Sequence, residues 1–309
     1  MPQRQKKSRG GRHKKTRFSS RRLTVALLLA VIGLAAAYAH YHRQPVATLS
    51  TTAKHPRTLI KKNSPPPPAP PVIAEPAPAK ARFALVIDDM GYHQKIGDAL
   101  LDLPFDLSFA FLPFAPHTES QLQHARIQGR DILLHLPMEA TDKKWDPGQG
   151  ALFLSMNRQT MRRTVQQDLA AVPDAIGVNN HMGSRFTENE PAMRALLGML
   201  KQRHLFFLDS LTSPNSIGFR VAEKLGMPAL HRNVFLDNQQ DKEIIKKQLD
   251  TLIFLAKKQG IAIGIAHPHQ ATLDALRDFL RHQDKTVVLV SISSLLGDRE
   301  TMGQTTLKR

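Results

Sequence analysis

Beyond Arg82 the chain alternates between short apolar segments and longer segments with helical periodicity, and this alternation limits the folds that it can adopt. A strand that is apolar along its whole length is typical of a parallel sheet whose two faces are both covered. Strands that alternate with helices favour a parallel α/β architecture. The predicted strands are Phe83–Ile87, Leu107–Phe111, Asp131–Leu134, Ala175–Val178, Leu205–Leu208, Pro228–Leu230, Ile261–Ala266 and Thr286–Ser291.

Helical spacing of apolar residues predicts Gln159–Val172, Asp241–Gln259 and Thr272–Arg281 as helices. Another helix is expected to begin at a capping box formed by Thr187 and Glu190. With about eight strands in some 220 residues, a (β/α) barrel is the leading prediction and a doubly wound open sheet the alternative. The sequence has no dinucleotide-binding glycine fingerprint and no phosphate-binding loop, which argues against a nucleotide-binding sheet.

The formal net charge of +17 is concentrated near the N-terminus. Of 43 Lys and Arg and 26 Asp and Glu, residues 1–81 hold 16 basic side chains and one acid, so the remaining chain carries only +2. The basic part lacks the aromatic platforms typical of single-stranded nucleic-acid binding, so we expect no nucleic-acid partner. The absence of cysteine excludes disulfides, thiolate zinc sites and cysteine nucleophiles.

Composition divides the N-terminal part into three segments. Residues 1–22 predict a disordered basic tail, and residues 43–80 predict a proline-rich linker. Between them, residues 23–42 predict a signal anchor or a signal peptide. The uncharged stretch 23–39 approaches the length of a membrane span, and its basic flank orients the N-terminus to the cytoplasm.

Cleavage after the small-residue pattern that ends at Ala39 is the alternative to an uncleaved anchor. Either outcome would place the globular part, residues 81–300, in the periplasm. It would be anchored in the inner membrane through residues 23–39, or released after cleavage. Residues 301–309 are expected to form a disordered tail.

Polar residues capable of chemistry follow several of the predicted strands. In a parallel sheet the carboxyl ends of the strands meet at one edge, where ligands bind. A carboxylate with two imidazoles suits zinc or a similar divalent ion and leaves positions open for water. These strand-end residues are Asp88 with Asp89, His135, His181, Asp209, and His267 with His269.

A group of motifs spread over residues 82–300 resembles the divergent polysaccharide deacetylases, relatives of the NodB-type carbohydrate esterases. The resemblance implies a distorted (β/α) barrel of seven to eight strands and metal-dependent removal of N- or O-acetyl groups from sugars. It implies Asp88 as the base, Asp89 and His135 as metal ligands, and His267 as the acid. The motifs are Val86-Ile87-Asp88-Asp89-Met90-Gly91, His135-Leu136-Pro137-Met138-Glu139, Asn179-Asn180-His181-Met182-Gly183-Ser184, Leu208-Asp209-Ser210 and Gly264-Ile265-Ala266-His267-Pro268-His269.

The sequence departs from the wider family at two places. Glu139 stands where the second histidine of a His-x-x-x-His motif is expected, so either Glu139 or His181 completes the ligand set. We favour His181, because an imidazole preserves the ligand type. The arginine-proline-tyrosine segment of the wider family is missing, and Arg185 is a candidate substitute. Further supporting candidates are Asn180, Asp209 and His269.

The sequence therefore predicts a metal-dependent hydrolase, most suited to zinc, that removes acetyl groups from an envelope polysaccharide or peptidoglycan-type glycan. The alternative is a catalytically inactive glycan-binding or envelope-scaffold domain on the same barrel. Measurement of stoichiometric metal separates the two, because a scaffold needs no ion.

Overall fold

The computed structural model describes residues 80–281 and 286–296. The predicted basic tail, hydrophobic segment and linker, and the tail 301–309, lie outside these residues. Within them, no helix is long and apolar enough to cross a membrane.

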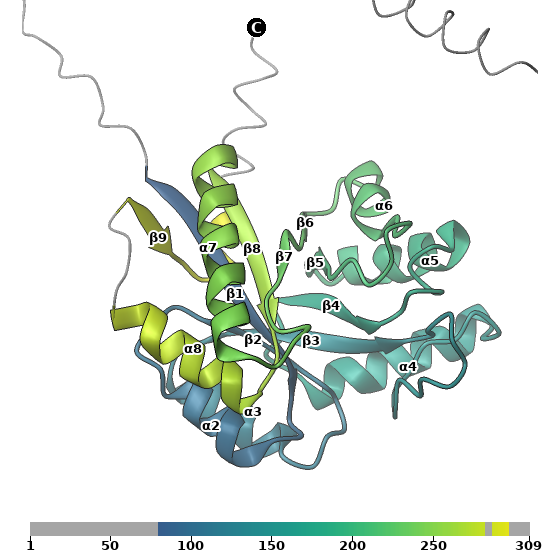
Figure 1. Cartoon of the computed structure of the whole chain (residues 1–309). Helices are drawn as coiled ribbons and strands as arrows, with labels where there is room; N and C mark the ends of the chain where they lie inside the picture. Colours follow the sequence, from purple (N-terminus) through teal and green to yellow (C-terminus); the bar gives the residue numbers. More distant parts are fainter. Residues whose placement is uncertain (1–79, 282–285, 297–309) are drawn as a thin grey trace, which may run out of the picture. The chain divides into compact units, whose positions relative to one another are not determined.

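The described strands form one parallel sheet. Eight of them follow the order β6-β5-β4-β3-β2-β1-β8-β7, and β9 pairs with the first residues of β1. Figure 1 shows β1 beside β8. The bounds are β1 (Ala81–Met90), β2 (Ser108–Phe111), β3 (Asp131–Met138), β4 (Gly177–Met182), β5 (Phe206–Asp209), β6 (Ala229–His231), β7 (Val234–Phe235), β8 (Ile261–Ala266) and β9 (Val287–Leu289).

The two ends of this strand order lie next to each other in the chain. β6 ends at His231 and β7 begins at Val234, with only Arg232 and Asn233 between them. Arg232 N donates to the carbonyl oxygen of Asp209 (3.0 Å), while Asn233 N donates to that of Ile263 (2.8 Å). Two residues can join the opposite edges only if the sheet curls back on itself. The distorted (β/α) barrel is therefore confirmed, and the open doubly wound sheet is wrong.

Helices cover the outside of the curled sheet (Figure 1). Because side chains alternate along a strand, Phe83 and Leu85 pack under the helices while Ala84 and Val86 face the barrel interior. Ile292 packs into the interior cluster as well. The helices are α2 (Gln94–Leu101), α3 (Thr118–Ile127), α4 (Arg158–Ala171), α5 (Glu190–Lys201), α6 (Gly218–Lys224), α7 (Lys242–Gln259) and α8 (Gln270–Arg281).

The predicted start of α5 is wrong. Its N-cap is Asn189, whose side chain accepts a hydrogen bond from Ala192 N. Thr187 instead donates its hydroxyl hydrogen to the carbonyl oxygen of Gly183 (2.9 Å), which commits it to the preceding turn. The helix α7 begins after Asp241 and ends at Gly260, in agreement with the prediction.

The strands β1, β3 and β4 continue beyond their predicted ends, so Asp88 and Asp89 lie inside β1 and the setting of two histidines changes. His135 lies inside β3, which continues to Met138, and His181 lies inside β4. Pairing of the two strands sets His135 opposite Asn179. Both imidazoles are therefore carried by hydrogen-bonded strands rather than by loops.

Candidate metal centre and active site

A β-bulge at the end of β1 places the two neighbouring aspartates at the mouth of the barrel. Ile87 pairs with Phe109 and Met90 with Phe111, so β1 has one residue more than β2 over this interval. Asp89 adopts the left-handed conformation (φ 54°), which is uncommon for a residue other than glycine. Bulges of this kind turn a side chain toward a site and are frequent next to active sites.

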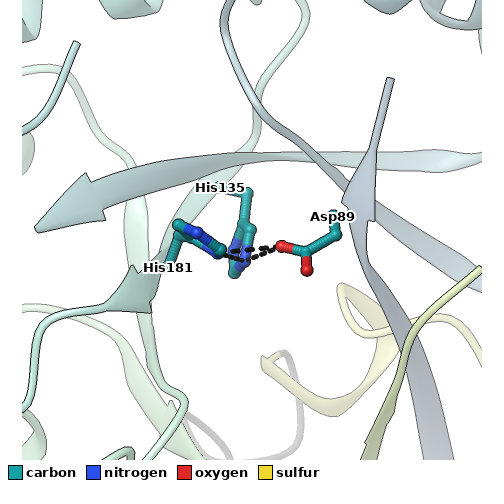
Figure 2. A group of neighbouring side chains, drawn as sticks. All are labelled: Asp89, His135 and His181. Carbon is teal, nitrogen blue, oxygen red and sulfur yellow. Dashed lines mark hydrogen bonds and ion pairs between the residues drawn. The ribbon is translucent and has the colours of Figure 1, made fainter. Parts of the chain in front are cut away.

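Three side chains from three strands converge at this mouth. Asp89 Oδ1 lies 2.8 Å from His181 Nδ1 and 3.1 Å from His135 Nε2, and the two nitrogens are 3.2 Å apart. Figure 2 shows both imidazoles directed at the same carboxylate oxygen. The carboxylate comes from the β1 bulge, and the imidazoles come from β3 and β4.

The hydrogen bonding of these groups fits a bound cation. Asp89 Oδ1 is buried and makes no hydrogen bond of acceptable geometry, although two imidazole nitrogens lie close to it. Asn179 donates its amide hydrogens to Asp88 Oδ1 (2.8 Å) and Ser210 Oγ (3.2 Å). Its Oδ1 therefore accepts from His135 Nδ1 (2.9 Å), so in the neutral ring the lone pair is on Nε2, which faces Asp89. One carboxylate oxygen and two imidazole nitrogens suit zinc-like divalent ions.

Burial raises and nearby histidines lower the pKa of each aspartate, and the net shift differs between the two. Burial tends to raise the pKa of Asp89, but the adjoining His135 and His181 outweigh it and lower that pKa far below its usual range. For Asp88 burial prevails, and its pKa is raised despite the opposing effects of His135 and His267. The exposed fraction of Asp88 is only 2%. The pair thus offers one strongly ionised carboxylate and one with raised proton affinity.

His267 lies near the other carboxylate oxygen of Asp89 and is held by a second carboxylate, Asp237. His267 Nε2 is 4.0 Å from Asp89 Oδ2, while its Nδ1 is 2.9 Å from Asp237 Oδ1. Asp237 Oδ2 accepts from His267 N (2.6 Å) and from Thr272 Oγ1 (2.7 Å). Burial tends to lower the pKa of His267, but the bond and charge of Asp237 outweigh it and raise it to about 9.

Asp237, His267 and His269 form a second cluster with metal-ligand spacing. Both oxygens of Asp237 are already used by donors, unlike Asp89 Oδ1. His269 stacks on His267 with ring centroids 6.0 Å apart, and its Nε2 is 3.2 Å from the amide nitrogen of Gln240. These hydrogen bonds indicate that Asp237 orients the His267 ring and does not bind a metal.

Glu139 and Arg185 contact each other instead of joining the three-residue cluster. Glu139 Oε1 is 3.2 Å from Arg185 Nη1, and its Oε2 accepts from Leu154 N (2.7 Å). The carbonyl oxygen of Glu139 also accepts from the amides of Arg185 and Phe186. These contacts tie the loop after β3 to the loop after β4. His181, and not Glu139, is the residue that the structure brings to Asp89 and His135.

Asn180 and Asp209 organise loops near the site. Asn180 Oδ1 accepts from Ser210 N (2.9 Å). Asp209 turns toward α6, where its Oδ2 accepts from Ser216 Oγ (2.7 Å) and from Phe219 N (3.0 Å). This outward direction follows from strand alternation, because the preceding Leu208 faces the barrel interior.

The motif-based prediction gave no role to three residues that build the site. Asn179 bridges Asp88 and His135, and Asp237 orients His267. Arg232 donates to the carbonyl oxygens of Ser210 (2.7 Å) and Leu211 (2.8 Å) and lies over the ring of Phe235. Burial lowers the pKa of Arg232, although the negative charges of Asp88 and Asp209 act to raise it. The only sequence signal for Asp237 was the short apolar run Val234-Phe235-Leu236 before it.

Comparison with known proteins identifies relatives along the barrel. An uncharacterized protein of Haemophilus influenzae is 37% identical over 217 residues, covering 70% of this chain and 77% of the relative. The uncharacterized protein YibQ of Escherichia coli is 35% identical over 217 residues, covering 70% and 68%. The crystal structure of an uncharacterized Agrobacterium tumefaciens protein, ATU2773, superposes with a TM-score of 0.68 at 26% identity, covering 71% of this chain and 91% of that one.

The family comparison covers the same part of the chain. Residues 85–296, which include every residue of the two clusters, match the sequence model of the divergent polysaccharide deacetylases. The chain belongs to the divergent polysaccharide deacetylase family.

Proposed function

We propose that this protein is a metal-dependent hydrolase that removes acetyl groups from a polysaccharide or peptidoglycan-type glycan of the cell envelope. The observation that carries the proposal is the convergence of Asp89, His135 and His181 on one point, with a buried carboxylate oxygen that lacks a hydrogen bond. Asp88 and His267 lie within 4.0 Å of members of this group.

The three ligand candidates suit zinc best among common divalent ions, because two of them are imidazoles. Such an ion would polarise the acetyl carbonyl and lower the pKa of a water molecule toward neutrality. His135 is prepared for this role by Asn179, which fixes the ring tautomer.

Asp88 is the proposed general base. Its carboxylate is buried and held in place by Asn179, and its raised pKa brings its proton affinity closer to that needed to accept a proton from water. His135 Nε2 is 3.8 Å from Asp88 Oδ2, so the base lies next to the ligand group. A water molecule held by the ion at Asp89, His135 and His181 would thus be within reach of Asp88.

His267 is the proposed general acid. The Asp237 carboxylate receives the Nδ1 hydrogen of His267, so the Nε2 hydrogen remains available toward the site. A pKa raised to about 9 keeps the ring protonated at neutral pH. It would donate this proton to the amine or alcohol that leaves the acetyl group.

Acetate release from acetylated oligosaccharides tests the proposal. The purified protein should release acetate with zinc, contain about one equivalent of metal, and lose activity when Asp88 is changed to Asn. A protein that releases no acetate, and whose metal content is the same in wild type and Asp89→Ala, would contradict it. That outcome would support a catalytically inactive glycan-binding or scaffold domain.

We also propose that residues 23–39 direct the barrel to the periplasm. The uncharged stretch and its basic flank support this placement. Protease added to spheroplasts should degrade the barrel, and N-terminal sequencing of the mature protein would distinguish an anchor from cleavage near Ala39. Full protection from protease in intact spheroplasts would refute a periplasmic barrel.

A further inference from the structure

Arg232 lies at the mouth of the barrel, in the two-residue connection between β6 and β7. Because it directly follows β6, it belongs to the same edge of the sheet as the metal cluster. Its Nε donates to the carbonyl oxygen of Ser210 (2.7 Å) and its Nη2 to that of Leu211 (2.8 Å). Both acceptors directly follow β5. Two bonds from different nitrogens therefore fix the guanidinium to the loop after β5.

Further contacts connect Arg232 to both sides of the site. The hydroxyl of Ser210 accepts from Asn179 Nδ2 (3.2 Å), and the same amide holds the proposed base. The guanidinium carbon of Arg232 also lies 5.2 Å from the centroid of the Phe235 ring. That centroid is 5.0 Å from the centroid of His267, the proposed acid. One residue thus separates Arg232 from the proposed acid, and two separate it from the proposed base.

The guanidinium of Arg232 has no carboxylate in direct contact. Among residues 80–281 and 286–296, no carboxylate oxygen lies within 4.0 Å of its nitrogens. Burial lowers the pKa of Arg232, and the opposing effects of the Asp88 and Asp209 charges do not offset it. A cation withdrawn from water is normally paired, because desolvation of an isolated ion is costly. Arg232 therefore carries a positive charge that an anion from outside could pair.

One donor nitrogen of Arg232 remains available for such an anion. Its Nη1 makes no hydrogen bond with the described residues and is not one of their buried unpaired atoms, so solvent reaches it. Two other arginines differ in this respect. Arg185 is paired, since its Nη1 is 3.2 Å from Glu139 Oε1. Arg130 donates through both Nη1 and Nη2 to carbonyl oxygens, and it precedes β3 at the opposite end of the barrel.

We propose that Arg232 binds a carboxylate of the substrate, so that the acetylated sugar carries an acidic substituent. The substrate class rests on the proposed function. A guanidinium forms charge-assisted hydrogen bonds with a carboxylate at its edge while its face stacks on an aromatic ring, here Phe235. A carboxylate fits better than a phosphate dianion, because Asp88, Asp89 and Asp237 already bring negative charge to the mouth.

Pairs of ligands that differ only at the carboxyl group test this inference. One pair is the disaccharide N-acetylglucosaminyl-N-acetylmuramic acid and its methyl ester, and the other is an O-acetylated diuronate and its methyl ester. Binding is measured by calorimetry with zinc-loaded Asp88→Asn, which should not turn the sugars over. The acid of one pair should bind about tenfold more tightly than its ester. The pair that shows the preference identifies the source of the carboxylate.

Substitutions in the same background assign the preference to a residue. Arg232→Gln should bind the ester unchanged and lose the preference for the acid. Arg232→Lys should keep part of the preference, because the charge remains and the planar fork is lost. Arg185→Gln is the matched control, since it removes a guanidinium that is already paired, and it should keep the full preference.

Equal affinities for acid and ester in both pairs, or binding of neither acid, would overturn the inference. It would also be overturned if Arg232→Gln weakened acid and ester equally, which is the result expected of a residue that only holds the loop after β5. Preference for an acid in a protein that releases no acetate would reject the proposed function and keep this inference. Acetate release without any preference for the acids would do the reverse.

Discussion

The two histidine–aspartate clusters contain the same residue types but differ in how their carboxylates are bonded. Asp89 Oδ1 faces two imidazole nitrogens and makes no hydrogen bond, whereas both oxygens of Asp237 are occupied by donors. Proximity alone would make each a metal site. Their hydrogen bonds distinguish the two clusters, because a carboxylate whose oxygens already accept hydrogen bonds has fewer free lone pairs to bind a cation.

The different bonding of the two carboxylates also gives the histidines of the two clusters different roles. His135 and His181 direct ring nitrogens at one oxygen, while His267 directs one nitrogen at Asp237 and the other at Asp89. We therefore expect substitutions in the first cluster to remove metal. Substitutions in the second cluster should alter proton transfer while leaving the metal in place.

The largest effect is expected for Asp89→Asn. Asparagine tolerates the left-handed backbone of this position, so the fold should persist while the anionic ligand is lost. Bound metal should fall from about one equivalent to near zero, and kcat/KM for acetate release should fall by about 10³-fold or more. Elemental analysis and an acetate assay measure the two quantities.

Glu139→Gln is the matched control for this experiment. It removes a carboxylate whose oxygens contact Arg185 and Leu154, and it should retain the metal. Metal loss in Glu139→Gln, with retention in Asp89→Asn, would reverse the assignment of the cluster.

Asp237→Asn should have the next largest effect and should spare the metal. Without the anionic partner the pKa of His267 falls from its raised value of about 9, so the ring loses its proton at lower pH. The alkaline limb of the kcat/KM profile should therefore move to lower pH, with activity reduced about 10²-fold. A variant that keeps its profile but loses its metal would place the ion at the second cluster.

Asn179→Leu should produce a smaller loss in metal affinity. The amide fixes the His135 tautomer and holds Asp88, and orienting partners of this kind are worth about 10- to 100-fold in affinity. Competition with a chromophoric chelator measures the dissociation constant. Asn180→Leu, which disturbs a neighbouring loop contact, serves as comparison. Equal losses in both variants would indicate a general structural role.

Sequence periodicity was sufficient for the barrel because most strands are apolar runs bounded by helical patterns. It failed at β7, whose two residues Val234 and Phe235 are too few to show a period. The residue that follows this short strand segment, Asp237, was missed for the same reason. The start of α5 was misplaced since Thr187 and Asn189 are both good capping residues, and only the Gly183 turn decides between them.

Most residues of the site could be predicted from the sequence, but the directions in which their side chains point could not. The bulge that turns Asp89 toward the mouth depends on pairing with β2. Likewise, Asn179 and Asn180 are equivalent in the sequence, and the register of β3 with β4 decides which one contacts His135. Such information resides in long-range pairing and not in local patterns.

Asp168 on α4 is a second carboxylate with buried oxygens that lack hydrogen bonds. Unlike Asp89, it has no imidazole cluster around it in the described residues. Burial raises its pKa from 3.8 to about 8. The folded state therefore binds more protons than the unfolded state between these values, so this group's stabilising contribution is lost as pH rises from about 4 to 8.

Asp168→Asn should remove this pH dependence. Between pH 5 and 7 the unfolding free energy of the wild type should fall, relative to that of the variant, by up to about 1.4 kcal/mol for each unit that the pH rises. Urea unfolding at both pH values measures it, and the slope is compared because a buried amide adds a cost that pH does not change. Glu119→Gln, which replaces an exposed carboxylate, is the matched control. If the unfolding free energies of wild type and Asp168→Asn change with pH in parallel, the buried Asp168 carboxylate remains ionised without a partner. A missing hydrogen bond at Asp89 would then be weaker support for a metal than the converging imidazoles.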